Sequence, residues 1–211
     1  MSVYRIFLLS PANCSGQRAR LLFSEATTFP LARRLRGSEG VSLGESFSFI
    51  SGLYFRGKLT YSKQFASPPR GTPGVLVITP TRGLLRPEEP ITVERLREFS
   101  QVDIETRDPR YLHPLRKDVR RLAERAGDNY QVVLLGSIAT GKYYEVLAEF
   151  LGDRLVFPAD FVGRGDMSRG GLLLRCAAAR QELGYVPFAG ASRHGSRPPR
   201  LLRAGTANSR G

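Results

Sequence analysis

The sequence predicts one α/β domain over residues 1–189 and a basic, disordered tail over residues 190–211. Within the domain we expect three layers, with a mainly parallel sheet between two layers of helices. Three observations lead to this prediction: short apolar segments are bounded by proline or glycine, amphipathic segments separate them, and hydrophobic residues make up an ordinary 41% of the chain. Alternation of buried strands with amphipathic helices is typical of parallel sheets.

Four segments have the length and composition of buried strands. They span residues 4–9, 74–79, 130–135 and 154–159, and each is short and mostly apolar. The runs are continuously apolar and do not alternate with polar residues, which is typical of strands that are covered on both faces.

The segments between these strands have helical periodicity. Residues 53–66 and 113–126 repeat apolar side chains every three or four positions, and the second segment has a strongly basic outer face. Further helices are expected over residues 142–151 and 171–183. Residues 24–50 are polar and interrupted by proline and glycine, which predicts a long loop or an insertion.

The chain is strongly basic, with 32 lysine and arginine residues against 19 aspartate and glutamate residues, a net charge of +13. Such a surface attracts polyanions, so nucleic acid, phosphorylated ligands and acidic lipid headgroups are plausible partners. The alternative is an arginine-rich composition of genomic origin, with no special target. Two distant cysteines, no signal-peptide pattern and no bilayer-length apolar run predict a soluble, cytoplasmic protein with no membrane partner.

Residues 136–143, GSIATGKY, match the phosphate-binding pattern G-x-x-x-x-G-K-[ST] at seven of eight positions. The eighth residue, Tyr143, cannot replace the hydroxyl that binds Mg²⁺, and it belongs to the apolar stripe of the following helix. We therefore expect Tyr143 in the core and a tight strand-to-helix turn. The alternative is an anion contact by Ser137, Thr140 and Lys142 at the start of the helix.

The residues that follow the four strands favour a ligand site. Ligands of open parallel sheets collect beyond the carboxyl ends of the strands, and here these ends are rich in serine, threonine, glycine or arginine, which contact phosphate and sugar. Ordinary turn chemistry is the alternative for each loop taken alone. The expected substrate- or phosphate-binding residues are Ser10, Asn13, Ser15, Arg18, Thr81, Arg82, Ser137, Thr140, Lys142, Arg164, Ser168 and Arg169.

The segment GRGDMSRGG, residues 163–171, is expected to be a loop at this site, because its four glycines let the backbone approach a ligand closely. Its one carboxylate, Asp166, stands between two arginines, whose charges would keep it ionised. We expect Asp166 to be the catalytic residue, which orients a reacting hydroxyl or amine or acts as a base. The alternative is a structural aspartate–arginine pair that holds the loop.

No other catalytic arrangement emerges from the residue types and their spacing, and we predict neither a metal site nor a cofactor. Tyr54, Lys58, Tyr61 and Phe65 form an aromatic and basic line at helical spacing. Such a line can stack bases, but a partly buried helix face is the preferred interpretation.

The order of these segments resembles the YaaA-like group of bacterial α/β proteins and their uncharacterised relatives. The resemblance is carried by LLSPANCSG, by the helix GLYFRGKLTYSKQFA with its LY-x-x-x-x-x-x-Y spacing, and by VITPTRGLLRPEEPITVERL with its GLL-x-P. It covers roughly residues 3–190, and the segment FVGRGDMSRGG departs from the pattern of the group. A more distant similarity is to the α/β domain of archaeosine-synthase-type tRNA modification proteins, without their catalytic signature. The resemblance implies association with nucleic acid or a role in stress, and no defined reaction.

Three functions fit these observations. We expect binding of nucleic acid, DNA or RNA, or of a nucleotide-like ligand at the rim of the sheet, with processing of a base as a possible step. The second function is an enzyme acting on a small phosphorylated metabolite. The third is an interaction protein without chemistry.

Overall fold

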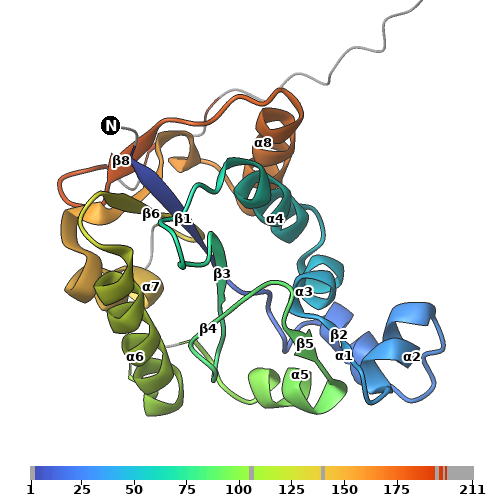
Figure 1. Cartoon of the computed structure of the whole chain (residues 1–211). Coiled ribbons are helices and arrows are strands. Elements are labelled where there is room, and N and C mark those ends of the chain that lie inside the picture. The colour runs from blue at the N-terminus through green and yellow to red at the C-terminus, as the bar shows by residue number, and fades with distance from the viewer. Residues whose placement is uncertain (1–2, 105–106, 139–140, 193–194, 197, 199–211) are drawn as a thin grey trace, which may run out of the picture.

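The structure, a computed structural model, describes residues 3–104, 107–138, 141–192, 195–196 and 198 (Figure 1). Thr140 and the predicted tail beyond residue 198 therefore lie outside the described residues. The helices and strands are β1 (Tyr4–Leu9), α1 (Gln17–Phe23), α2 (Pro30–Arg36), β2 (Val41–Ser42), α3 (Leu43–Ser51), α4 (Leu53–Phe65), β3 (Val75–Ile78), β4 (Leu84–Leu85), β5 (Pro90–Ile91), α5 (Val93–Ser100), α6 (Pro109–Ala126), β6 (Tyr130–Leu135), α7 (Gly141–Leu151), β7 (Leu155–Pro158), α8 (Asp166–Ala178) and β8 (Tyr185–Pro187).

The main sheet has six strands in the order β4-β3-β1-β6-β7-β8. Strands β3, β1, β6 and β7 are parallel neighbours, whereas the edge strands β4 and β8 run antiparallel to them. The central pair β1 and β6 is in register from Tyr4 opposite Tyr130 to Leu9 opposite Leu135. The mainly parallel sheet and its four apolar strands, which the sequence predicts, are thereby confirmed.

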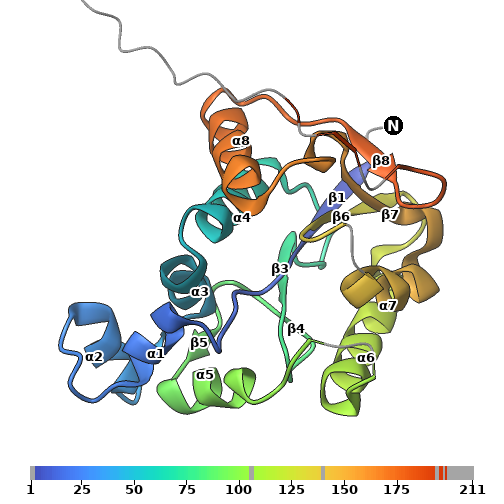
Figure 2. The same cartoon turned by 180° about the vertical axis from the view of Figure 1, so that it is seen from behind.

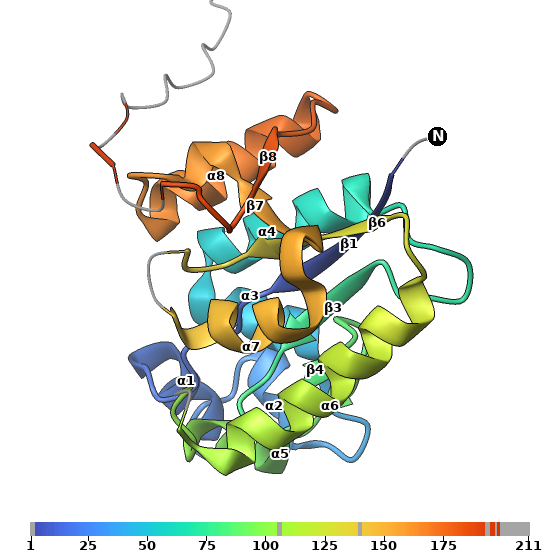
Figure 3. The ribbon, with the colours of Figure 1, turned by 90° about the vertical axis from the view of Figure 1, so that its left-hand side faces the viewer.

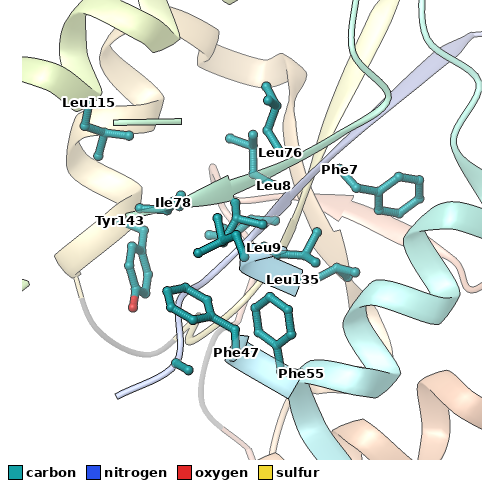
Figure 4. Close-up of a cluster of buried hydrophobic side chains, with 14 of the residues drawn as sticks. Phe7, Leu8, Leu9, Phe47, Phe55, Leu76, Ile78, Leu115, Leu135 and Tyr143 are labelled. Atoms are coloured by element: carbon teal, nitrogen blue, oxygen red, sulfur yellow. The ribbon is translucent and has the colours of Figure 1, made fainter. Parts of the chain in front are cut away.

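The central strands are buried along most of their length. Leu8 and Leu9 of β1 and Leu135 of β6 have no exposed surface, and burial of each such side chain contributes about 1.5–3 kcal/mol. Figure 4 shows them at the centre of an apolar cluster, with Phe47 of α3 and Phe55 of α4 on one side. The two phenylalanine rings meet edge to face, with their centroids 5.4 Å apart.

Helices lie on two sides of strand β1. Helices α4 and α8 pack together on one side, and α6 and α7 lie on the other (Figures 1 to 3). The first pair approaches closely because glycines face each other: a Cβ on Gly57 of α4 would lie 2.7 Å from the carbonyl oxygen of Gly170 of α8. No side chain fits in that space, so both positions need glycine. None of the described helices is long and apolar enough to cross a bilayer.

Residues 24–50 are not the long loop that the sequence predicts, because α2, β2 and α3 lie within them. Pro30 stands at the first turn of α2, where proline is favoured, and Ala32 and Leu35 are buried. The Ser42 side chain accepts a hydrogen bond from the backbone N–H of Glu45 and so caps α3. Proline and glycine, which interrupt a helix when they lie in its interior, lie in the first turns of α2 and α3.

The glycine-rich segment 163–171 is also different from the prediction. Helix α8 begins at Asp166, five residues earlier than expected, so most of the segment is helical. An acidic residue in the first turn of a helix interacts favourably with the helix dipole, which accounts for Asp166 at this place. Gly170 is used for packing against α4 and not for approach to a ligand, so this part of the loop prediction is wrong.

The first residues of the predicted tail contact the domain. A Cβ on Gly163 would lie 2.2 Å from the carbonyl oxygen of Ser196, and one on Gly195 would lie 2.8 Å from Val162. Residues 195–196 therefore pack against the segment that leads into α8.

Candidate functional site

The carboxyl ends of β3, β1, β6 and β7 lie at one edge of the main sheet, because these strands are adjacent and parallel. The loops that follow them meet at this edge, which we call the carboxyl edge. It is the place where open parallel sheets bind ligands.

A cavity of about 270 Å³ opens at the carboxyl edge, and we call it the edge cavity. It is lined by the loop after β1, by Pro80 in the turn after β3, by the end of α5 with the loop that follows, and by the start of α7. Three residues predicted to bind phosphate, Asn13, Ser15 and Lys142, are among its walls. Lys142 is exposed, so its ammonium group is available to a ligand in the cavity.

Some of the predicted residues make contacts within the protein instead. The Arg82 guanidinium forms two hydrogen bonds of 2.8 Å with the carboxylate of Glu98 on α5, and the Thr81 hydroxyl donates to the same carboxylate. This ion pair holds the turn after β3 against α5. The negative charge of Glu98 also compensates the charge that Arg82 would offer to a phosphate.

The loop after β1 combines a turn with one long-range contact. The Asn13 side-chain oxygen accepts hydrogen bonds from the backbone N–H and the hydroxyl of Ser15, which fixes the turn before α1. Arg18 donates to the backbone oxygen of Phe49 at 3.3 Å. These contacts are ordinary loop chemistry, and they still leave Asn13 and Ser15 at the wall of the edge cavity.

Arg164 and Ser168 belong together at the start of α8. Arg164 donates to the backbone oxygen of Asp160 at 2.9 Å and to the Ser168 hydroxyl at 3.3 Å. The arginine therefore ties the short helical turn after β7 to the first turn of α8. Both side chains are partly exposed.

The turn that resembles a phosphate-binding loop leads into α7. Tyr143 is buried and lies in the apolar cluster at the ends of the strands, as the helical stripe predicts (Figure 4). Burial, together with the charge of Asp166, raises the pKa of Tyr143 to about 12. Ser137 is partly exposed on the same turn, and Thr140 lies outside the described residues.

Lys58 of α4 is the most unusual residue at the carboxyl edge. It is 1% exposed, and its Nζ lies 2.6 Å from the backbone oxygen of Ser10 and 2.9 Å from the Ser10 hydroxyl. The rings of Tyr54 and Phe55 lie 4.5 and 4.9 Å from Nζ. Burial lowers the pKa of Lys58 from 10.5 to about 7, against a smaller opposite effect of the Asp166 charge.

Arg169 is the second buried cation, 8% exposed on α8. It donates to the backbone oxygen of Phe161 through two nitrogens, at 3.0 and 3.3 Å, and to the backbone oxygen of Gly136 at 3.4 Å. Asp166 is 3.9 Å away, but its side chain is 72% exposed. Asp166 therefore lies at the surface beside Arg169, and its catalytic role stays a prediction, as does the alternative of a structural pair with the arginine.

The hydroxyl of Tyr54 completes this group. It is buried beside Arg169 and makes no hydrogen bond of ordinary geometry with any described residue. Burial raises the pKa of Tyr54, and the Arg169 charge opposes this shift. A buried hydroxyl without a partner costs about 1–3 kcal/mol, so it points to a water molecule or a ligand at this place.

We call Ser10, Tyr54, Lys58, Asp166 and Arg169 the carboxyl-edge cluster. It contains the two buried cations of the described chain, and no aspartate or glutamate is buried among the described residues. Buried charges are normally paired with an opposite charge. Arg169 therefore has no buried counter-charge, and an anionic ligand would supply one.

Sequence reasoning included Ser10, Asp166 and Arg169 but missed the chemistry of Lys58 and Tyr54. The prediction that their helix face is buried is confirmed for Tyr54, Lys58 and Tyr61. The available signal was a lysine within a stripe of aromatic residues, four positions after Tyr54 and three before Tyr61. A charge at such a position is buried when the helix packs.

Comparison with protein-family models, with characterised proteins and with solved structures finds no match to this chain. The resemblance to the YaaA-like group and to archaeosine-synthase-type proteins therefore stays a prediction.

Proposed function

We propose that the protein binds a phosphate-bearing, nucleotide-like ligand, free or within DNA or RNA, at the carboxyl edge of its sheet. The observation that carries the proposal is the buried guanidinium of Arg169, which has no buried carboxylate beside it and shares its cluster with the buried amine of Lys58. A phosphate group would supply the missing charge and would also accept a hydrogen bond from the Tyr54 hydroxyl. The expected three-layer arrangement is part of this proposal, because it leaves the carboxyl edge as the side open to a ligand.

The edge cavity gives the ligand a second contact surface. Lys142, Asn13 and Ser15 line it together with Tyr143, and the charge of Asp166 reaches this tyrosine. The volume of about 270 Å³ lies just below the range of about 300–1,000 Å³ for small-molecule sites. We therefore infer that the cavity holds part of a nucleotide, and that Asp166 orients a hydroxyl or amine of the same ligand.

The small volume also favours a second candidate, an enzyme for a small phosphorylated metabolite. The two candidates predict different affinities. A nucleic-acid protein binds long polyanions more tightly than mononucleotides, whereas a metabolite enzyme is stabilised by one small phosphorylated compound and gains nothing from chain length.

The test is fluorescence anisotropy of the full chain with labelled single-stranded DNA, duplex DNA and tRNA over a salt series, with thermal shifts for mononucleotides. Lys142→Ala should weaken binding about tenfold, because a charge-assisted hydrogen bond to phosphate is lost. Lys117→Ala is the matched control, since Lys117 is an exposed lysine on α6 outside the edge cavity, and it should change affinity less than twofold.

Two results would overturn the proposal. One is the absence of binding to every phosphate-bearing probe by a folded sample. The other is an equal loss of affinity in the Lys142 and Lys117 variants, which would show that the net positive charge binds polyanions without a site.

A further inference from the structure

The Lys58 amine and the Ser10 hydroxyl are close enough for proton transfer. The distance of 2.9 Å between Nζ and Oγ is that of a hydrogen bond, and the 2.6 Å contact from Nζ to the Ser10 backbone oxygen holds the amine in place. A neutral amine at this position donates to the backbone oxygen and accepts the proton of the hydroxyl. A charged ammonium group would donate to both oxygens.

The surroundings of Lys58 favour the neutral amine. Tyr54 faces it from its own helix, Ser10 from the loop that follows β1, and Asp166 and Arg169 from α8. The only carboxylate in this set, Asp166, is exposed, and Arg169 carries a positive charge that disfavours a second one. Burial lowers the pKa of Lys58 to about 7, so a large fraction of the amine is unprotonated at neutral pH.

Ser10 lies at the carboxyl edge of the sheet and is 6% exposed. Ser10 follows the last residue of the central strand β1, and the next residue, Pro11, lines the edge cavity. Gly136, at the end of β6, lies against Ser10: a Cβ there would come within 2.8 Å of the Ser10 Cβ. Glycine at this position lets the end of β6 lie close to Ser10.

We infer that Ser10 and Lys58 form a nucleophile–base pair that acts on a phosphate ester bound at the carboxyl edge. This inference rests on the proposed function for its substrate class. It assigns Ser10 as the nucleophile and Lys58 as the general base, a pairing known from serine–lysine enzymes on other folds.

The reaction balances without a further reactant except water. The Ser10 Oγ forms a bond to phosphorus while the bond from phosphorus to the leaving alkoxide oxygen breaks. The proton of the hydroxyl passes to Nζ of Lys58 and from there to the leaving oxygen. Water then hydrolyses the phosphoserine, which releases phosphate or its remaining monoester and restores Ser10.

Arg169 and Tyr54 are placed to stabilise the charge of the phosphoryl group. A guanidinium has five N–H groups, and three of those of Arg169 donate to backbone oxygens, which leaves two for phosphoryl oxygens within the described structure. The Tyr54 hydroxyl lies beside the Arg169 guanidinium and makes no hydrogen bond of ordinary geometry with a described residue. Donors that are fixed before the ligand arrives lower the barrier of such a reaction.

The test is covalent labelling of the full chain with a fluorophosphonate, which forms a bond between Oγ and phosphorus and releases fluoride. Mass spectrometry of the intact protein and of its peptides should find one modification, at Ser10. The labelling rate should rise with pH to a plateau, with its midpoint near pH 7. Ser10→Ala should abolish labelling, and Lys58→Met should slow it at least about hundredfold. Ser38→Ala, at an exposed serine that does not line the edge cavity, should leave the labelling unchanged.

The pH profile of the unaltered protein decides the question if Lys58→Met does not fold. Labelling elsewhere than at Ser10, no labelling, or a rate that keeps rising to pH 10 would overturn the pair. Nucleotide binding by Ser10→Ala separates the two proposals. If the protein binds nucleotides but is not labelled, the proposed function holds and the nucleophile–base pair is refuted. If it is labelled but binds no nucleotide, the pair holds and its proposed substrate class is refuted.

Discussion

Two regions near the carboxyl edge differ in the partners of their cations. In the turn after β3, the Arg82 guanidinium lies flat against the Glu98 carboxylate, and the two side chains are 48% and 32% exposed. In the carboxyl-edge cluster, the buried Arg169 donates to backbone oxygens, and the buried Lys58 amine contacts the backbone oxygen and the hydroxyl of Ser10. Arg82 thus has a carboxylate at hydrogen-bond distance, whereas the carboxylate nearest to Arg169, that of Asp166, is 3.9 Å away and 72% exposed.

The difference shows that a cation at the end of a strand indicates a binding site only when its own contacts within the protein are known. Arg82 and Arg169 are both arginines that follow strands of the parallel sheet, Arg82 in the turn after β3 and Arg169 in the helix after β7. The carboxylate of α5 makes the first a structural ion pair, whereas no carboxylate is buried beside the second. Buried charge without a counter-charge is costly and is typical of functional sites.

The largest expected contrast is in the free energy of unfolding. Arg169→Ala leaves the backbone oxygens of Phe161 and Gly136 without their donors and should destabilise the protein by about 3 kcal/mol. Arg82→Ala removes an exposed pair and should cost about 0.5 kcal/mol. Urea unfolding followed by circular dichroism measures both. Similar values for the two variants would break the comparison.

The second contrast is in the pH dependence of stability. The pKa of Lys58 is lowered from 10.5 to about 7 in the folded protein, so between these values the unfolded chain binds a proton that the folded protein does not. The contribution of Lys58 is therefore complete above pH 10.5 and is lost as the pH falls through about 7. Relative to Lys58→Met, the unaltered protein should gain up to about 1.4 kcal/mol per pH unit in this window.

Urea unfolding of both proteins at intervals from pH 7 to pH 9.5 measures this difference, in which all other titrating groups cancel. Lys117→Met is the control, because Lys117 is exposed, and its difference curve should be flat. A flat curve for Lys58→Met would mean that Lys58 stays charged in the folded protein.

A smaller effect is expected at Tyr54. Tyr54→Phe removes a buried hydroxyl that has no partner among the described residues, so it should raise stability by up to about 1 kcal/mol. The same change should weaken binding of a phosphate-bearing ligand about fivefold, because the hydroxyl then has no bond to offer. A gain in stability together with a loss of ligand affinity would indicate that Tyr54 is a binding residue. A loss of stability would assign Tyr54 a structural role instead.

The sequence predicts what depends on local pattern. The four buried strands, the parallel sheet, the helix over residues 53–66 and the buried place of Tyr143 all follow from runs or stripes of apolar residues. Residues 24–50 were misread because Pro30 and Gly44 have different effects at the start and in the middle of a helix. The pairing of Arg82 with Glu98 and the burial of Lys58 depend on tertiary contacts between distant segments, which periodicity does not encode.

The smallest expected effect on stability is that of the ion pair between Arg82 and Glu98. The hydrogen bonds from Arg82, with a smaller effect from Thr81, hold the pKa of Glu98 below its usual value of 4.5. The stabilisation by this pair is therefore present above pH 4.5 and is lost as the pH falls through the lowered pKa. A double-mutant cycle of Arg82→Ala and Glu98→Gln should give a coupling of about 0.5–1 kcal/mol at pH 7 that fades toward pH 3.

The two regions are also expected to differ in their effect on the affinity for phosphate-bearing ligands. If Glu98 neutralises Arg82, Arg82→Ala should leave that affinity within twofold, whereas Glu98→Gln should free the guanidinium and raise the affinity. An unaltered affinity in Glu98→Gln, with a loss in Arg82→Ala, would place Arg82 in the ligand site. The carboxyl-edge cluster would then share the phosphate with the turn after β3, and the two regions would form one site.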